Sequence, residues 1–155
     1  MSPIRPKCFF IALIGGWVVA IFLPSLVVAA AGLSPVAAGR NLAAATIEVA
    51  DEVAPAAKIG FALLFALLLY ARRRWNRVPP LPADILIGSA AMLVVLALLP
   101  LQWSRGFGIG LSASRFDPPL LAAYFLGGAL AGLAFHLAEK RCLRRSYPDD
   151  SPSAE

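Results

Sequence analysis

The chain has 155 residues, of which 59% are hydrophobic and only 15% are charged. A soluble domain averages roughly 45–50% apolar and about 25% charged residues, so an ordinary soluble domain is excluded. Intrinsic disorder is excluded because it requires low hydrophobicity and high charge. Two cysteines are too few for a disulfide-stapled secreted domain. A small polytopic membrane protein remains.

We predict an all-α fold, a polytopic bundle of four transmembrane helices. The apolar stretches are continuous and rich in Leu, Ala and Val, whereas a barrel needs short alternating strands. About 20 residues cross the hydrocarbon core. Residues 1–142 form one transmembrane domain and residues 143–155 a disordered cytoplasmic tail. The predicted spans are residues 9–31, 56–74, 84–103 and 118–138.

Three residues are expected to shape the ends of these spans. Pro24 lies inside the first span and should kink it or end its first part. Asp84 can accept backbone N–H bonds at the start of the third span. Asp117 followed by Pro118 is a favourable start for the fourth.

A cleaved signal peptide is the rival interpretation of the first span. Arg5 and Lys7 precede an apolar stretch, and Ala29 and Ala31 offer a small-residue cleavage site before Gly32. Cleavage would leave three spans in the same orientation.

The basic residues divide unequally between the two sides of this topology. The side with fewer carries Arg40, Lys58, Arg105 and Arg115. The positive-inside rule therefore places both termini in the cytoplasm. The Ala/Arg/Pro-rich composition leads us to expect a bacterial inner membrane. We interpret the richer side as a topology signal beside lipid headgroups and expect no nucleic-acid binding. Its ten residues are Arg5, Lys7, Arg72, Arg73, Arg74, Arg77, Lys140, Arg141, Arg144 and Arg145.

The segment 35–53 is predicted to form an external amphipathic helix that starts near Ser34 and Pro35. Its apolar positions are Leu42, Ala45, Val49 and Val53, and its acidic ones are Glu48, Asp51 and Glu52. Three carboxylates suit a divalent cation, but a solvated face is the simpler interpretation. Arg105 and Arg115, in the other external segment, are expected to pair with this acidic face.

Few residues could carry chemistry. His136 is the only histidine, with Glu139 one turn away as its expected partner. It supplies neither a haem nor a zinc site alone, so we predict no cofactor and no metal. Cys8 and Cys142 are expected on the reducing cytoplasmic side as free thiols, near each other only if the first and fourth spans pack together. The centres of the spans hold no charged residue, which argues against a proton pump or a single-chain ion channel.

The fourth span carries small residues that permit close helix contact. Gly128 and Gly132 form a GxxxG motif, and Ala123, Gly127 and Ala131 lie in a row beside it. Gly15 and Gly16 offer a matching groove in the first span. The sequence leaves open whether this contact is within the chain or between chains.

We therefore predict a non-enzymatic accessory, scaffold or stabilising subunit of a membrane assembly, whose partners are the lipid bilayer and another membrane protein or a second copy. The alternative is a small homo-oligomeric transporter for a neutral or lipophilic substrate. A third hypothesis is a membrane enzyme that uses Arg105, Arg115 and the carboxylates of residues 48–52 on an envelope substrate.

Overall fold

A computed structural model describes residues 6–34, 39–53, 55–75, 81–98 and 118–145. These residues form five helices and, within those ranges, no strand. Four of the helices are long and apolar enough to cross a membrane. The predictions of an all-helical chain and of four apolar helices long enough to span are confirmed. The helices are α1 (Pro6–Ala30), α2 (Leu42–Glu52), α3 (Pro55–Trp75), α4 (Leu81–Leu98) and α5 (Pro118–Arg145).

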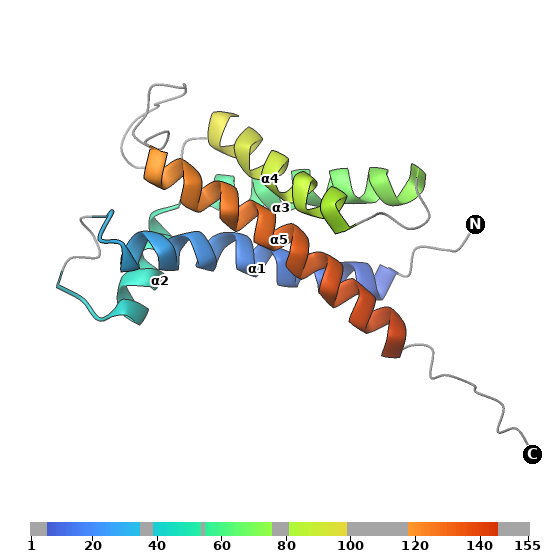
Figure 1. Ribbon diagram of the computed structural model, residues 1–155, viewed down its shortest axis with the longest axis horizontal. Coiled ribbons are helices and arrows are strands. Elements are labelled where there is room, and N and C mark those ends of the chain that lie inside the picture. Colours follow the sequence, from blue (N-terminus) through green and yellow to red (C-terminus); the bar gives the residue numbers. More distant parts are fainter. Residues whose placement is uncertain (1–5, 35–38, 54, 76–80, 99–117, 146–155) are drawn as a thin grey trace, which may run out of the picture.

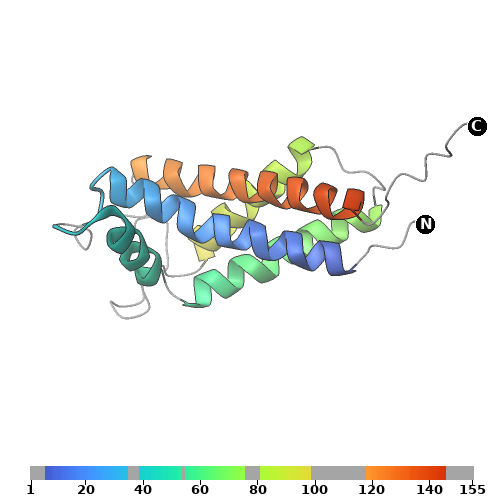
Figure 2. The same ribbon diagram turned by 90° about the horizontal axis from the view of Figure 1, so that it is seen from below.

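Helices α1 and α5 lie side by side and form the largest interface of the bundle (Figures 1 and 2). Helix α4 packs on α5, α3 packs mainly on α4, and α2 lies against α1. The start of α1 and the end of α5 are at the same end of the bundle, which we call the basic end. Helix α2 lies at the opposite end, the α2 end.

Helix α5 extends further than the sequence predicted. Its last turns contain Leu143, Arg144 and Arg145, which were assigned to a disordered tail. Basic side chains in a last turn interact favourably with the negative end of the helix dipole, so they extend the helix. Helix α4 begins at Leu81, three residues before the predicted start. The predicted end of that span, residues 99–103, lies outside the described residues.

Pro24 does not end α1, which continues as one helix to Ala30. The pyrrolidine ring lies where a Cβ on Gly127 would stand only 2.2 Å from it. Ser25 donates from its hydroxyl to the carbonyl of Ile21 at 2.7 Å. The proline is therefore packed into a gap that a glycine of α5 leaves open, and tertiary packing overrides the helix-breaking tendency.

Gly32 ends α1. Its φ of 64° is a left-handed conformation that glycine adopts without steric cost. The N–H of Leu33 donates to the carbonyl of Val28 at 3.0 Å, and that of Gly32 to Ala29 at 3.2 Å. This is the Schellman pattern of a helix C-terminus. Gly32, the first residue after the possible cleavage site, is thus also a helix stop signal.

Helix α2 starts later than Ser34 and Pro35, the start that the sequence predicted. Its N-cap is Asn41, whose side-chain oxygen accepts from the N–H of Ala44 at 2.8 Å. Ala45 and Val49 are buried as expected, and Val49 packs with Val28 and Ala123. Leu42, predicted on the same face, is exposed, and it is the first residue of the helix.

Small residues set the helix spacing at two crossings of α5. A Cβ on Gly128 would stand 2.6 Å from the carbonyl oxygen of Gly88 in α4, and one on Gly132 would stand 2.1 Å from that of Asp84. A Cβ on Gly16 of α1 would stand 2.9 Å from the carbonyl oxygen of Ala131. These contacts are all within the chain. Gly15, by contrast, has nothing within 4 Å of an added Cβ.

Aromatic rings fill the core between these crossings. The ring of Phe135 meets Phe9 edge to face at 5.4 Å and Phe65 at 5.9 Å between centroids. Phe61 stacks on Phe65 at 5.2 Å. Rings from α1, α3 and α5 therefore interlock, which fixes how these three helices face one another.

Candidate functional site

Four charged or titratable side chains meet between α3, α4 and α5 near the basic end. Arg73, in the last turn of α3, donates to both carboxylate oxygens of Asp84 at 3.1 Å each. It also donates to Glu139 of α5, at 3.1 Å from Nε to Oε2 and 2.5 Å from Nη2. One guanidinium thus holds two carboxylates from two other helices, with its fork matching the planar acceptors.

His136 completes this group, which we call the charge cluster. Its Nδ1 lies 2.8 Å from Oδ2 of Asp84. The guanidinium carbon of Arg73 lies 5.2 Å from the centroid of the Phe135 ring, within cation–π range. Asp84 is fully buried and the Arg73 side chain is 7% exposed. Buried charges are costly unless paired and hydrogen-bonded, and each member here has partners.

The chain topology places these residues at the same height along the bundle axis. Helix α3 ends and α4 begins at the basic end, only six residues apart, and α5 ends there too. The close approach of α5 to the Asp84 backbone at Gly132 brings His136, one turn further on, within reach of the short Asp84 side chain. A larger residue than glycine at position 132 would hold the two helices apart.

The charge cluster corrects three sequence predictions. Arg73 was assigned to lipid headgroups, but it turns into the bundle, where two carboxylates compensate its charge. The Asp84 carboxylate, expected to cap α4, pairs with Arg73 and His136, because α4 starts a turn earlier. Glu139, the expected partner of His136, bonds to Arg73 instead.

Cys8 and Cys142 are not free thiols, as the sequence predicted, but form a disulfide between α1 and α5 with their Cα atoms 5.5 Å apart. The condition stated for their approach, packing of the first span on the fourth, is met by the α1–α5 interface. Cys142 lies three residues after Glu139, so the disulfide and the charge cluster are neighbours on α5.

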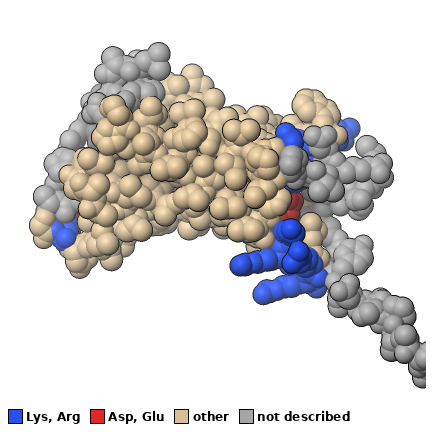
Figure 3. Space-filling model, in the orientation of Figure 1, with Lys and Arg blue, Asp and Glu red and all other residues tan. Residues whose placement is uncertain are grey.

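Most described basic residues gather at the basic end, while the middle of the face shown in Figure 3 carries no charged residue. Their helices end or begin there, as the alternation of spans requires. Arg5 and Arg77 lie outside the described residues. Apart from the buried Arg73, the basic set of this end is Lys7, Arg72, Arg74, Lys140, Arg141, Arg144 and Arg145.

The three acidic residues of α2 do not form a common site, because each has a different environment. Glu48 forms an ion pair with Arg40, Glu52 accepts from the Ser34 hydroxyl at 3.5 Å, and Asp51 is exposed. Among the described residues, no group of three or more His, Cys, Asp or Glu side chains is arranged to hold a metal ion. The pairing expected with Arg105 and Arg115 falls on residues that are not described.

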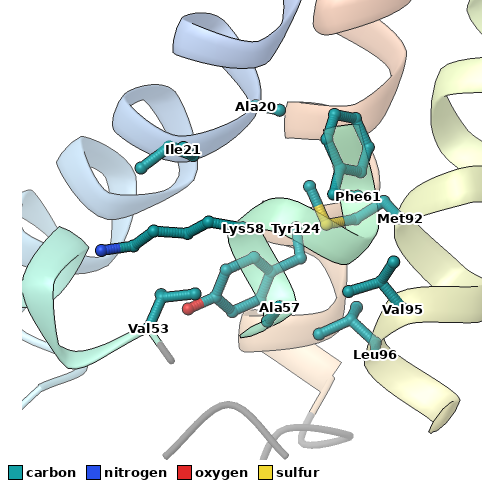
Figure 4. A pocket seen from close by; sticks show the side chains of 10 residues that line it. All are labelled: Ala20, Ile21, Val53, Ala57, Lys58, Phe61, Met92, Val95, Leu96 and Tyr124. Carbon is teal, nitrogen blue, oxygen red and sulfur yellow. The ribbon is translucent and has the colours of Figure 1, made fainter. Parts of the chain in front are cut away.

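A pocket lies towards the α2 end, between α1, α3, α4 and α5 (Figure 4). Among the described residues that line it, two have polar side chains: Tyr124, whose hydroxyl points towards Val53, and Lys58, whose ammonium points away from the other lining residues. The indole N–H of Trp17 donates to the Lys58 carbonyl at 3.0 Å and joins α1 to α3 beside it. The remaining lining is apolar: Ala20, Ile21, Val53, Ala57, Phe61, Met92, Val95 and Leu96.

Sequence reasoning missed the charge cluster although the signal was present. The predicted topology already placed Arg73, Asp84, His136 and Glu139 on the same side of the membrane. Arg73 was interpreted as a headgroup contact, Asp84 as a helix cap, and His136 and Glu139 as partners of each other within one helix. Two carboxylates beside a single run of arginines, all at the ends of spans, would have suggested an interhelical ion pair.

No protein-family model, curated protein or solved structure matches this chain.

Proposed function

We propose that this chain is a small integral protein of a bacterial inner membrane that acts as a non-enzymatic accessory or scaffold subunit. Both termini and the basic end lie in the cytoplasm, as the positive-inside rule favours. The charge cluster supports a structural role for its members, because each of these side chains is engaged with another helix.

The observation that carries the proposal is the outer face of α3. Ile59, Leu63 and Leu67 recur every four residues and are 57%, 68% and 63% exposed. Helix α3 makes a limited contact with α4 and a smaller one with α1, so most of its surface is uncovered within the chain. In a membrane, such a ridge of large apolar residues can be covered by lipid chains or can pack into the groove of another transmembrane helix.

The test is purification of the tagged chain from native membranes in mild detergent, followed by mass spectrometry. We expect a stoichiometric partner that survives washing. The double variant Leu63→Ala/Leu67→Ala should lose it, because the ridge is removed. The matched control Leu86→Ala/Leu98→Ala, on the exposed face of α4, should retain it. Recovery of the chain alone would contradict the proposal.

The second candidate is a homo-oligomeric transporter for a neutral or lipophilic substrate, which the pocket favours. Its lining is apolar apart from the Tyr124 hydroxyl and Lys58, as in sites for apolar ligands, but its cavity volume of about 30 Å³ is far below that of a typical ligand site, so transport requires the pocket to widen. This candidate requires one discrete homo-oligomer by native mass spectrometry. Met92→Trp, which fills the pocket, should then abolish transport without changing that oligomer.

A further inference from the structure

Two properties of the basic end imply different chemical environments. Its excess of Lys and Arg favours the cytoplasm. The disulfide between Cys8 and Cys142 lies at the same end, and the cytoplasm keeps thiols reduced. We propose that Cys8 and Cys142 form a reversible redox site that exchanges with small cytosolic thiols of the glutathione class. This proposal rests on the proposed orientation of the chain.

The packing of α1 on α5 makes such a cycle possible without unfolding. Phe9, next to Cys8, meets Phe135 at 5.4 Å, and Gly16 lies against the Ala131 backbone further along the same interface. These contacts do not depend on the disulfide. The two cysteines therefore stay adjacent when the bond is broken, and the bond can re-form as an intramolecular step at high effective concentration.

Exposure decides which sulfur is attacked. Cys8 is 3% exposed, whereas Cys142 is only partly buried. The thiolate of the small thiol attacks Sγ of Cys142, the disulfide breaks, and Cys8 leaves as a thiolate that takes a proton from water. A second small thiol attacks the mixed disulfide, which releases the small-molecule disulfide and leaves Cys142 as a thiol. The reverse sequence restores the bond.

Charge favours an anionic thiol at this position. Lys140 and Arg141 flank Cys142 on the exposed surface of α5, and Arg144 and Arg145 follow. A cluster of cations raises the local concentration of an anionic co-substrate such as glutathione. Glu139, one turn before Cys142, bonds to Arg73, so the disulfide also anchors the turn that completes the charge cluster.

The test measures the thiol state of the full chain in intact cells. Acid quenching followed by a maleimide mass tag separates reduced from oxidised chains on a non-reducing gel. After a pulse of dithiothreitol we expect mainly the reduced form, and after diamide mainly the oxidised form, with the oxidised fraction changing severalfold within minutes. A fraction that stays fully oxidised, or fully reduced, under both treatments overturns the proposal.

Two variants locate the site and check the orientation. Cys8→Ser should leave a Cys142 that forms a mixed disulfide with glutathione, while Cys142→Ser should leave a buried Cys8 that does so at least severalfold more slowly. Equal rates contradict the assigned point of attack. Leu143→Cys in a Cys8→Ser/Cys142→Ser background should resist a membrane-impermeant maleimide in intact cells. Labelling there places the disulfide outside the cytoplasm and overturns the redox site, whereas failure to find a protein partner affects only the accessory-subunit proposal.

Discussion

The two ends of this bundle are held together by different physics. At the basic end, a guanidinium, two carboxylates, an imidazole and a disulfide join four helices through directional bonds. At the α2 end, Val28, Val49 and Ala123 join α1, α2 and α5 through apolar contact, and the Ser34 hydroxyl adds a long hydrogen bond of 3.5 Å to Glu52. The stability of the basic end therefore depends mainly on specific polar partners, whereas that of the α2 end depends mainly on how apolar side chains fill the space between the helices.

This difference teaches where substitutions should be costly. A buried ion pair stabilises little in net terms, yet removing one partner leaves an uncompensated charge. Shortening a buried apolar side chain costs the transfer free energy of the removed atoms and a cavity term, both of which are small for residues of the size of Val and Ala. Substitutions at the charge cluster should therefore reduce stability more than substitutions at the α2 end. Substitutions at the glycine crossings should have an intermediate effect.

The largest effect is expected from Arg73→Met, which leaves Asp84 and Glu139 without their cation. Breaking a buried pair costs roughly 3–5 kcal/mol, and Asp84 has no exposed surface through which water could compensate. Thermal unfolding in detergent should show a large decrease in Tm.

The matched control is Arg74→Met, the exposed neighbour of Arg73, which should change the Tm little. Adding Asp84→Asn to Arg73→Met should recover part of the loss, since it removes one of the unpaired charges. Equal effects of the two arginine variants would show that the charge cluster is not formed.

A smaller loss is expected from Gly128→Leu, at the crossing of α4 and α5. Even the first carbon of the new side chain would stand 2.6 Å from a backbone oxygen of Gly88, so the helices must separate. Overpacking of this kind costs about 3 kcal/mol. Gly15→Leu, on α1 with open space around it, should leave the Tm unchanged; a similar decrease there would contradict the packing described.

Trp17→Phe should cost about 1 kcal/mol, the typical net contribution of one hydrogen bond. It removes the N–H that donates to the Lys58 carbonyl while it keeps most of the apolar surface. Chemical unfolding curves should show a small shift in midpoint. Trp75→Phe, at a residue that is 84% exposed, should show none.

The smallest global effect is expected from Asn41→Ala, which removes the N-cap of α2. The loss of about 1 kcal/mol falls on a helix that is not one of the four long apolar ones. Hydrogen exchange should become faster in residues 42–46 and stay unchanged in α5. Asn41→Ser, which retains a capping oxygen, should restore protection; if it does not, the cap is not the cause.

The sequence by itself determined the helices of this protein, because hydrophobic length is a local property. Continuous apolar stretches predicted the four long helices, and each begins within three residues of its predicted start, although α5 continues seven residues beyond its predicted end. Local signals also explain single ends, such as Gly32 after α1, although the sequence was interpreted differently there. The packing of the Pro24 ring against α5 could not be obtained in this way, since the position of Gly127 decides it. The start of α2 is a local signal, the N-cap Asn41, but the sequence was interpreted as starting this helix at Ser34 and Pro35.

Only the tertiary structure decided which side chains meet. Arg73 and Arg74 are the same residue type at adjacent positions, yet one is buried between two carboxylates and the other is exposed. The difference arises from the rotation of α3 about its axis and from the distance that Gly132 allows between α4 and α5. The disulfide depends likewise on α1 lying beside α5. Pairings between distant residues are set by how helices pack, and one sequence without its packing does not contain that information in any local pattern.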